Sequence, residues 1–79
     1  MRNRINEMAH TIHPKMSIHD LRRVPGPTHT NVIFDCVRPS DCELSAAEIK
    51  TRLSELVVAA YPEAVCKITV DEDYVSAEQ

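Results

Sequence analysis

Residues 45–60 read SAAEIKTRLSELVVAA, and this stretch carries the strongest local signal in the chain. It opens with the capping box Ser45-Ala46-Ala47-Glu48, in which the serine oxygen accepts a backbone N–H and the glutamate accepts the N–H of the cap residue. Apolar residues follow at offsets 0, 4, 7, 8 and 11, which is one face of a helix: Ile49, Leu53, Leu56, Val57 and Ala60. The stretch therefore predicts an amphipathic helix that packs on a core and ends at Pro62.

The segments around this helix alternate between apolar and polar residues, as strands do. Thr30 to Val37 is the clearest strand, and Met16 to Val24 predicts another before it. Val65 to Asp71 predicts a third strand after the helix. Pro25-Gly26-Pro27 predicts a turn between the first two strands, because proline fixes its own φ and donates no backbone hydrogen bond.

A further helix is predicted over Arg2 to His13, where apolar residues recur at offsets 0, 3 and 7 and Pro14 ends the pattern. The resulting order, α-β-β-α-β, lets two helices cover one face of a three-stranded mixed sheet. The sequence therefore predicts a single α+β domain over residues 1–79. We expect a two-layer ferredoxin-like αββαβ sandwich that lacks one strand, followed by a polar tail at 73–79.

The sheet face that the helices leave open carries the main candidate residues. Because side chains alternate across a strand, His19, Asp35 and Asp71 are predicted to point outward on the three strands. One imidazole and two carboxylates suit Zn²⁺, and also harder ions such as Mn²⁺ when water completes the shell. The competing interpretation is ordinary solvated surface, which is the commoner place for such side chains.

The same alternation sorts the cysteines and the remaining apolar residues. Cys36 and Cys66 are predicted to face inward and to behave as small buried hydrophobes, whereas Cys42 lies in a loop where exposure is expected. No C-x-x-C pair supports a zinc knuckle or a redox motif. Three apolar residues are predicted outward, which indicates that a partner, most simply a second copy of the chain, packs on this face: Leu21, Ile33 and Val37.

Two weaker metal candidates lie near these residues. Asp20, beside His19, is either a partner that orients the imidazole or a cap for the following turn. His29 lies in a loop and joins a site only if the loop folds back. His10 and His13 are three residues apart on the first helix, a spacing compatible with metal ligands. His13 lies next to Pro14 at the end of this helix, however, so a role other than metal binding is favoured.

Composition excludes several classes of function. The net charge of -3 argues against nucleic-acid binding, which needs a basic face. No run of 18 apolar residues is present to span a bilayer. No nucleophile–base pair at sensible spacing and no Gly-rich phosphate loop occurs, so an enzyme is not expected. Three cysteines in a chain without a signal peptide favour reduced thiols in the cytosol.

A series of short motifs covers nearly the whole chain. Ser17-Ile18-His19-Asp20-Leu21-Arg22 is followed by Gly26-Pro27-Thr28, and later by a helix that ends at a proline and a strand that closes on Asp71. In this order and spacing, the motifs resemble the cytoplasmic C-terminal domain of the cation diffusion facilitators, which are divalent-metal efflux transporters.

The resemblance implies an αββαβ domain on the cytoplasmic side of the membrane, which forms a homodimer and binds regulatory metal at the dimer interface. It implies that His19 and Asp71 correspond to metal ligands. Asp35 and Thr69 stand where many members have histidines, so a harder or weaker site, or none, is implied. Zn²⁺ is the expected ion, with Mn²⁺, Fe²⁺ and Co²⁺ as alternatives.

Transport chemistry in this family lies in transmembrane helices, which the sequence does not contain. Because the chain begins abruptly inside a helical pattern, we expect a domain that is joined to the transmembrane part of a larger transporter. Two alternatives stay open. The domain is a metal-free dimerisation scaffold, which the altered ligand positions favour, or it is a stand-alone soluble metal carrier or sensor.

Overall fold

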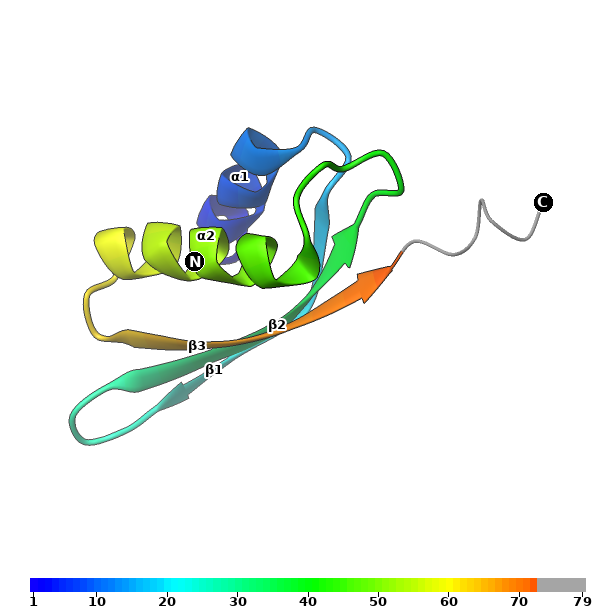
Figure 1. Cartoon of the computed structure of the whole chain (residues 1–79). Coiled ribbons are helices and arrows are strands. Elements are labelled where there is room, and N and C mark those ends of the chain that lie inside the picture. Colours follow the sequence, from blue (N-terminus) through cyan, green and yellow to red (C-terminus); the bar gives the residue numbers. More distant parts are fainter. Residues whose placement is uncertain (73–79) are drawn as a thin grey trace.

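The computed structural model describes residues 1–72 and confirms the predicted order of elements (Figure 1). The predicted polar tail, 73–79, lies outside the described residues. The helices and strands agree with the predicted ranges to within two residues. They are α1 (Arg2–Ile12), β1 (Ser17–Pro25), β2 (Thr30–Arg38), α2 (Ala46–Ala60) and β3 (Ala64–Glu72).

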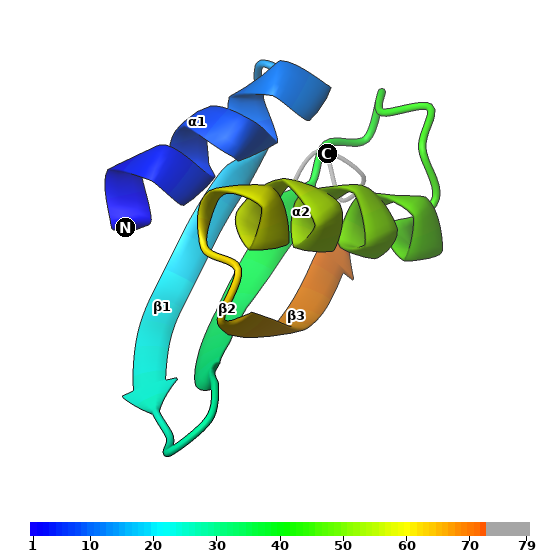
Figure 2. The same cartoon turned by 90° about the vertical axis from the view of Figure 1, so that its left-hand side faces the viewer.

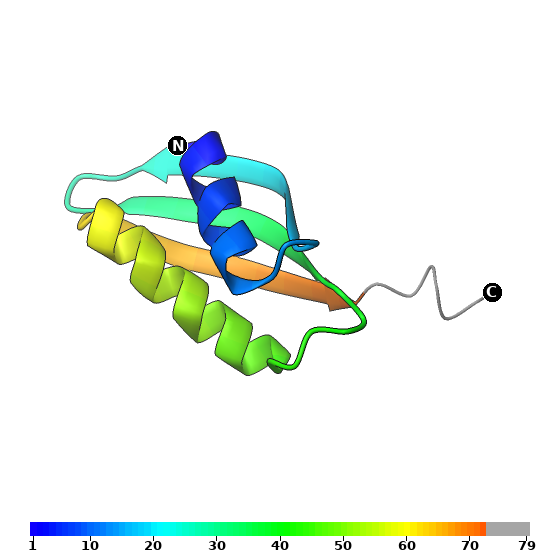
Figure 3. The same cartoon turned by 90° about the horizontal axis from the view of Figure 1, so that it is seen from above.

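The three strands form one mixed sheet in the order β1-β2-β3. β1 pairs with β2 in the antiparallel direction, and β3 returns beside β2 in the parallel direction after the α2 crossover. Both helices lie on the same face of the sheet (Figures 2 and 3). The predicted two-layer α+β sandwich is confirmed, and its second sheet face has no covering layer among residues 1–72.

The core lies between the helices and the central strand. Val32, Phe34 and Cys36 point from β2 into this layer and are almost completely buried, as the alternation predicted. The helices contribute a second set of buried apolar side chains, namely Ile5, Ala9, Ile49, Leu53 and Val57. Burial raises the pKa of the Cys36 thiol to about 11, with smaller contributions from Cys42 and Asp71, so Cys36 is a protonated, hydrophobic residue at neutral pH.

Strand β1 contains a bulge that was not predicted. The register of β1 on β2 slips between His19 and Arg22, so Asp20 and Leu21 together oppose the single residue Phe34. Asp20 has a φ of 55°, a left-handed conformation that aspartate tolerates better than most residues. The outward prediction for Leu21 was wrong, because the extra residue shifts the alternation and Leu21 packs half-buried against the core.

The loop between β2 and α2 folds back on the core around Arg38. The guanidinium donates from Nε to the carbonyl oxygen of Leu44 at 2.7 Å and from Nη2 to that of Cys42 at 2.8 Å. Its Nη1 pairs with Glu72 Oε1 at 3.1 Å, which ties the loop to the end of β3. The expected exposure of Cys42 was therefore wrong, since the held loop leaves this residue only 6% accessible.

The capping box at the start of α2 is present as predicted. Ser45 Oγ accepts from the Glu48 N–H at 3.2 Å, and Glu48 Oε1 accepts from the Ser45 N–H at 2.9 Å. The backbone N–H of Ser45, and then its hydroxyl, lower the pKa of the Glu48 carboxyl. The box therefore satisfies two backbone N–H donors, those of Ser45 and Glu48, at a helix end that would otherwise face only water.

Replacing Ser45 with Ala is expected to lower the free energy of unfolding by about 1 kcal/mol, because it removes the side-chain cap. Ser40→Ala, at an exposed loop position, is the matched control and is expected to change stability by less than about 0.5 kcal/mol. Urea unfolding followed by circular dichroism measures both. Equal stabilities of the two variants would contradict the role of the cap.

Candidate metal site on the open sheet face

Four rows of side chains cross the sheet face that the helices leave uncovered, which we call the open face. Residues paired across neighbouring strands point to the same side of a sheet. The rows follow from the two registers: Ser17–Val37–Asp71, His19–Asp35–Thr69, Arg22–Ile33–Lys67 and Val24–Asn31–Val65. We refer to the second of these as the His19 row.

His19 and Asp35 are direct cross-strand neighbours. Such pairs place their Cβ atoms about 5 Å apart, so an imidazole and a carboxylate can reach one ion or one another. His19 is exposed and Asp35 half-buried. The Oγ atom of Ser17 lies 3.1 Å from His19 Nε2, and no hydrogen bond joins Nδ1 to another group in residues 1–72. The histidine is thus oriented by a neighbour on its own strand.

A depression of about 430 Å³ lies on this side of β1. Asp20 and Asp35 bring two carboxylates to its wall, and Arg22 brings a compensating positive charge. The complete lining is Asp20, Leu21, Arg22, Ile33 and Asp35. The bulge places Asp20 in the same depression as Asp35, which the sequence pattern did not reveal.

Asp71 lies on the open face but outside the His19 row. Its partner on β2 is Val37, whereas the partner of Asp35 on β3 is Thr69. Two strand spacings, about 10 Å, separate β1 from β3, so His19 and Asp71 of one chain are not neighbours. The structure thus brings His19, Asp35 and Thr69 into one row and sets Asp71 in the next.

The other candidates lie away from this row. His29 is in the exposed β1–β2 turn, where its Nδ1 lies 3.2 Å from Thr28 Oγ1. His13 Nε2 contacts Asp41 Oδ1 at 3.1 Å, and its Nδ1 accepts the Lys15 N–H at 3.1 Å. His13 therefore joins the α1–β1 connection to the loop before α2, a structural role.

Two donors are too few to fix a metal ion by themselves. Structural zinc sites have four protein ligands, and catalytic sites have three. Within residues 1–72, no group of three or more His, Cys, Asp or Glu side chains is placed to hold an ion. In the His19 row, one chain brings only two such side chains together, the His19–Asp35 pair. The assignment of His19, Asp35 and Asp71 as ligands stays a prediction.

Comparison with known proteins supports the resemblance at the level of the fold. A solved structure described as "Mode of Action of a Putative Zinc Transporter CzrB" matches with a TM-score of 0.70 and 20% sequence identity, over 90% of this chain and 90% of that chain. No protein-family model matches the sequence, and no curated protein matches it. The fold that the resemblance implied is thus confirmed. Neither helix in residues 1–72 has the length and apolar content needed to cross a membrane.

Proposed function

We propose that this chain is the regulatory domain of a divalent-cation efflux transporter, in which it joins two subunits and responds to metal. The observation that carries the proposal is the match of fold over nine-tenths of both chains with the CzrB structure. The His19–Asp35 pair on the open face supports a metal-binding role. In this proposal the domain stands on the cytoplasmic side and performs no chemical reaction of its own.

A second copy of the chain is the proposed partner of the open face. Val24 and Val65 are 49% and 41% exposed there. Half-buried Ile33 lies between them and the His19 row, and half-buried Val37 lies on the other side of that row. Apolar side chains in such a position favour burial against another surface. If the copies meet about a two-fold axis, each contributes one His19–Asp35 pair, and the four donors suit a tetrahedral zinc ion.

Metal would then act by stabilising the paired state. An ion that binds the dimer better than the separated chains shifts the population toward the dimer, by an amount set by its differential affinity. In the proposed full transporter, pairing of two copies of this domain would favour one arrangement of the membrane-spanning parts. Asp71, one row from the His19–Asp35 pair, is available to the partner copy as a further ligand.

Calorimetric titration of Zn²⁺ into the reduced chain tests the metal site. We expect saturable binding that His19→Ala weakens at least tenfold, because one of two protein donors is lost. His10→Ala, an exposed histidine on α1, is the matched control and is expected to bind like the unaltered chain. Equal affinities of the two variants would rule out His19 as a ligand.

Mass measurement of the same samples tests the link between metal and assembly. The proposal expects the monomer–dimer dissociation constant to fall when Zn²⁺ is added, and the effect to disappear in His19→Ala. The absence of a three-donor group within residues 1–72 favours a second candidate, a metal-free dimerisation scaffold. That candidate expects a dimer whose stability does not depend on metal.

A further inference from the structure

The charges of this molecule are separated along its strands. We call the half that surrounds the β1–β2 turn the hairpin end; it comprises residues 1–6, 21–34 and 54–68. The hairpin end contains five basic and two acidic residues. The other half of the described chain, 7–20, 35–53 and 69–72, contains four basic and eight acidic residues. A chain of net charge -3 therefore presents a positive end.

Four arginines form the centre of this positive end. Arg22 and Arg23 are successive residues of the edge strand β1; Arg22 pairs with Ile33 on the open face, and Arg23 points to the helix side. Arg2 and Arg4 are exposed on the first turn of α1. None of these four forms an ion pair within residues 1–72, where the ion pairs involve His13, Lys15 and Arg38.

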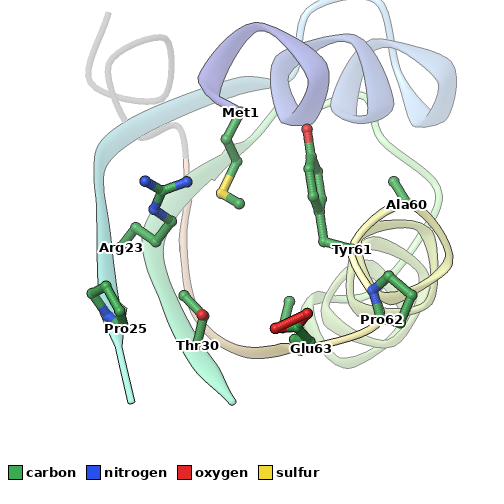
Figure 4. A pocket seen from close by; sticks show the side chains of 9 residues that line it. Met1, Arg23, Pro25, Thr30, Ala60, Tyr61, Pro62 and Glu63 are labelled. Atoms are coloured by element: carbon green, nitrogen blue, oxygen red, sulfur yellow. The ribbon is translucent and has the colours of Figure 1, made fainter. Parts of the chain in front are cut away.

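A cavity lies beside one of these arginines, Arg23. It has a volume of about 370 Å³ and lies between the start of α1, the end of β1 and the end of α2. Figure 4 shows the Arg23 side chain extending from β1 toward Met1, with Tyr61 on the opposite wall. Because Met1 and Arg23 both line the cavity, the start of α1 lies near Arg23; Glu63, one of the two acidic residues of the hairpin end, lines the cavity as well.

The tip of the hairpin is exposed and partly apolar. All residues from 22 to 29 are exposed, and Val24, at 49%, is the most exposed large hydrophobic residue of the described chain. The turn is tight, with the Gly26 N–H donating to the His29 carbonyl at 2.8 Å. A Cβ at Gly26 would lie only 2.8 Å from that oxygen, so glycine allows this close turn. Two prolines, Pro25 and Pro27, stiffen it.

We propose that the hairpin end binds the surface of a bilayer that contains anionic lipids. Arg2, Arg4 and Arg23, which lie outside the open face, supply attraction to the negative headgroups, while the two exposed prolines of the turn contact the interface beside them. Nucleic acid fits less well, because the hairpin end exposes no aromatic ring for base stacking: Phe34 is buried and Tyr61 is half-buried. The inference goes beyond the proposed function and requires neither metal nor dimer.

Co-sedimentation of the chain with vesicles tests this binding. We expect the chain to sediment with phosphatidylcholine vesicles that contain phosphatidylserine, and not with phosphatidylcholine alone. Salt is expected to release it, because screening at about 1 M reduces the Debye length to about 3 Å. Failure to bind the anionic vesicles at low salt would overturn the proposal, and so would equal binding to both vesicle types.

Charge variants locate the surface. A basic residue near an anionic bilayer contributes roughly a fivefold gain in partitioning, so R2Q/R23Q together are expected to weaken binding about 25-fold. K50Q/R52Q removes two exposed basic residues from α2 in the acidic half and is the matched control, with no loss expected. Equal losses in the two variants would assign the effect to net charge and overturn the proposed surface.

Two competitors separate this surface from other anion sites. Free phosphoserine, the headgroup alone, is expected not to displace the chain from vesicles, because it offers no extended surface. A single-stranded oligonucleotide is expected to compete weakly. Full displacement by either at comparable concentration would show an isolated anion site or a nucleic-acid surface instead. Arg2 and Arg23 lie outside the depression beside Asp35, so an unchanged zinc titration in R2Q/R23Q would keep this test independent of the metal proposal.

Discussion

Replacing Arg38 with Ala is expected to lower the free energy of unfolding by about 3 kcal/mol, the largest effect we expect from any single polar side chain in this domain. Arg38 donates to two carbonyl oxygens of the β2–α2 loop and to the Glu72 carboxylate, with donor–acceptor distances of 2.7 to 3.1 Å. Its side chain is 21% accessible, so water replaces these bonds only in part. Urea unfolding followed by circular dichroism measures the change.

Two further variants separate the contributions. Arg38→Lys keeps a positive charge near Glu72, but a single ammonium group cannot replace a guanidinium that donates to two carbonyl oxygens and a carboxylate. We therefore expect the lysine variant to lose about half as much unfolding free energy as the alanine variant. Arg52→Ala, at an exposed position of α2, is the control and is expected to cost less than about 0.5 kcal/mol. A loss of that small size for Arg38→Ala would contradict the role of these bonds.

The Arg38 contacts also bear on the open face. Glu72, which Arg38 holds, directly follows Asp71, so the same bonds fix the end of β3 where that carboxylate lies. Loosening the β3 end is expected to disturb Asp71 more than His19 and Asp35, which lie on the two strands next to each other. Zinc affinity in Arg38→Ala would therefore report whether Asp71 contributes to the site.

Most of the fold could be predicted because its core lies on one side of the sheet only. The burial of Val32, Phe34 and Cys36 follows directly from their period of two, since one face of β2 packs on helices. The capping box located the start of α2 to the residue. These are local patterns, and each agrees with the overall fold.

The errors concern features that depend on contacts distant in the sequence or on a break in the period. Ile18 and Leu21 are apolar residues three apart, a spacing that a bulge explains and a regular strand does not. Asp20, which lies between them and belongs to a residue type that tolerates positive φ, was the available sequence signal for the bulge. The burial of Cys42 depends on the reach of Arg38, and no local pattern indicates such a contact.

The candidate site could be predicted by face but not by row. Alternation places His19, Asp35 and Asp71 on the open face, but the parallel pairing of β2 with β3 decides which residue of β3 lies beside Asp35. That register is set after the α2 crossover by packing, which the sequence of the strand alone does not specify. The structure selects Thr69 as the neighbour, two residues before Asp71.

The row also predicts how to complete the site. The double variant Asp35→His, Thr69→His places three imidazoles side by side on the three strands, at spacings of about 5 Å. Three neutral imidazoles form a preferred zinc set, so we expect the zinc dissociation constant to fall at least a hundredfold, which corresponds to about 2.7 kcal/mol. Calorimetric or competition titration with a chromophoric chelator measures it.

The control moves one histidine to the neighbouring row. Asp35→His, Lys67→His has the same composition of added ligands on the same face, but Lys67 pairs with Ile33 rather than with Asp35. Its third imidazole lies about 7 Å along the strand from the position of Thr69. We expect a gain at least tenfold smaller than that of the first variant. Equal gains would show that the row has no influence on binding.

Comparing the unaltered chain with the Asp35→His, Thr69→His variant separates a metal site within one chain from a metal site between two chains. If the unaltered chain binds zinc only through the His19–Asp35 pairs of two copies, its apparent affinity must rise with protein concentration. Three imidazoles in one row can bind zinc without a second copy of the chain. Zinc binding by the Asp35→His, Thr69→His variant should therefore not depend on protein concentration. Concentration dependence in the unaltered chain together with its loss in that variant would place the native ion at a contact between two open faces, because only the variant has three donors within one chain.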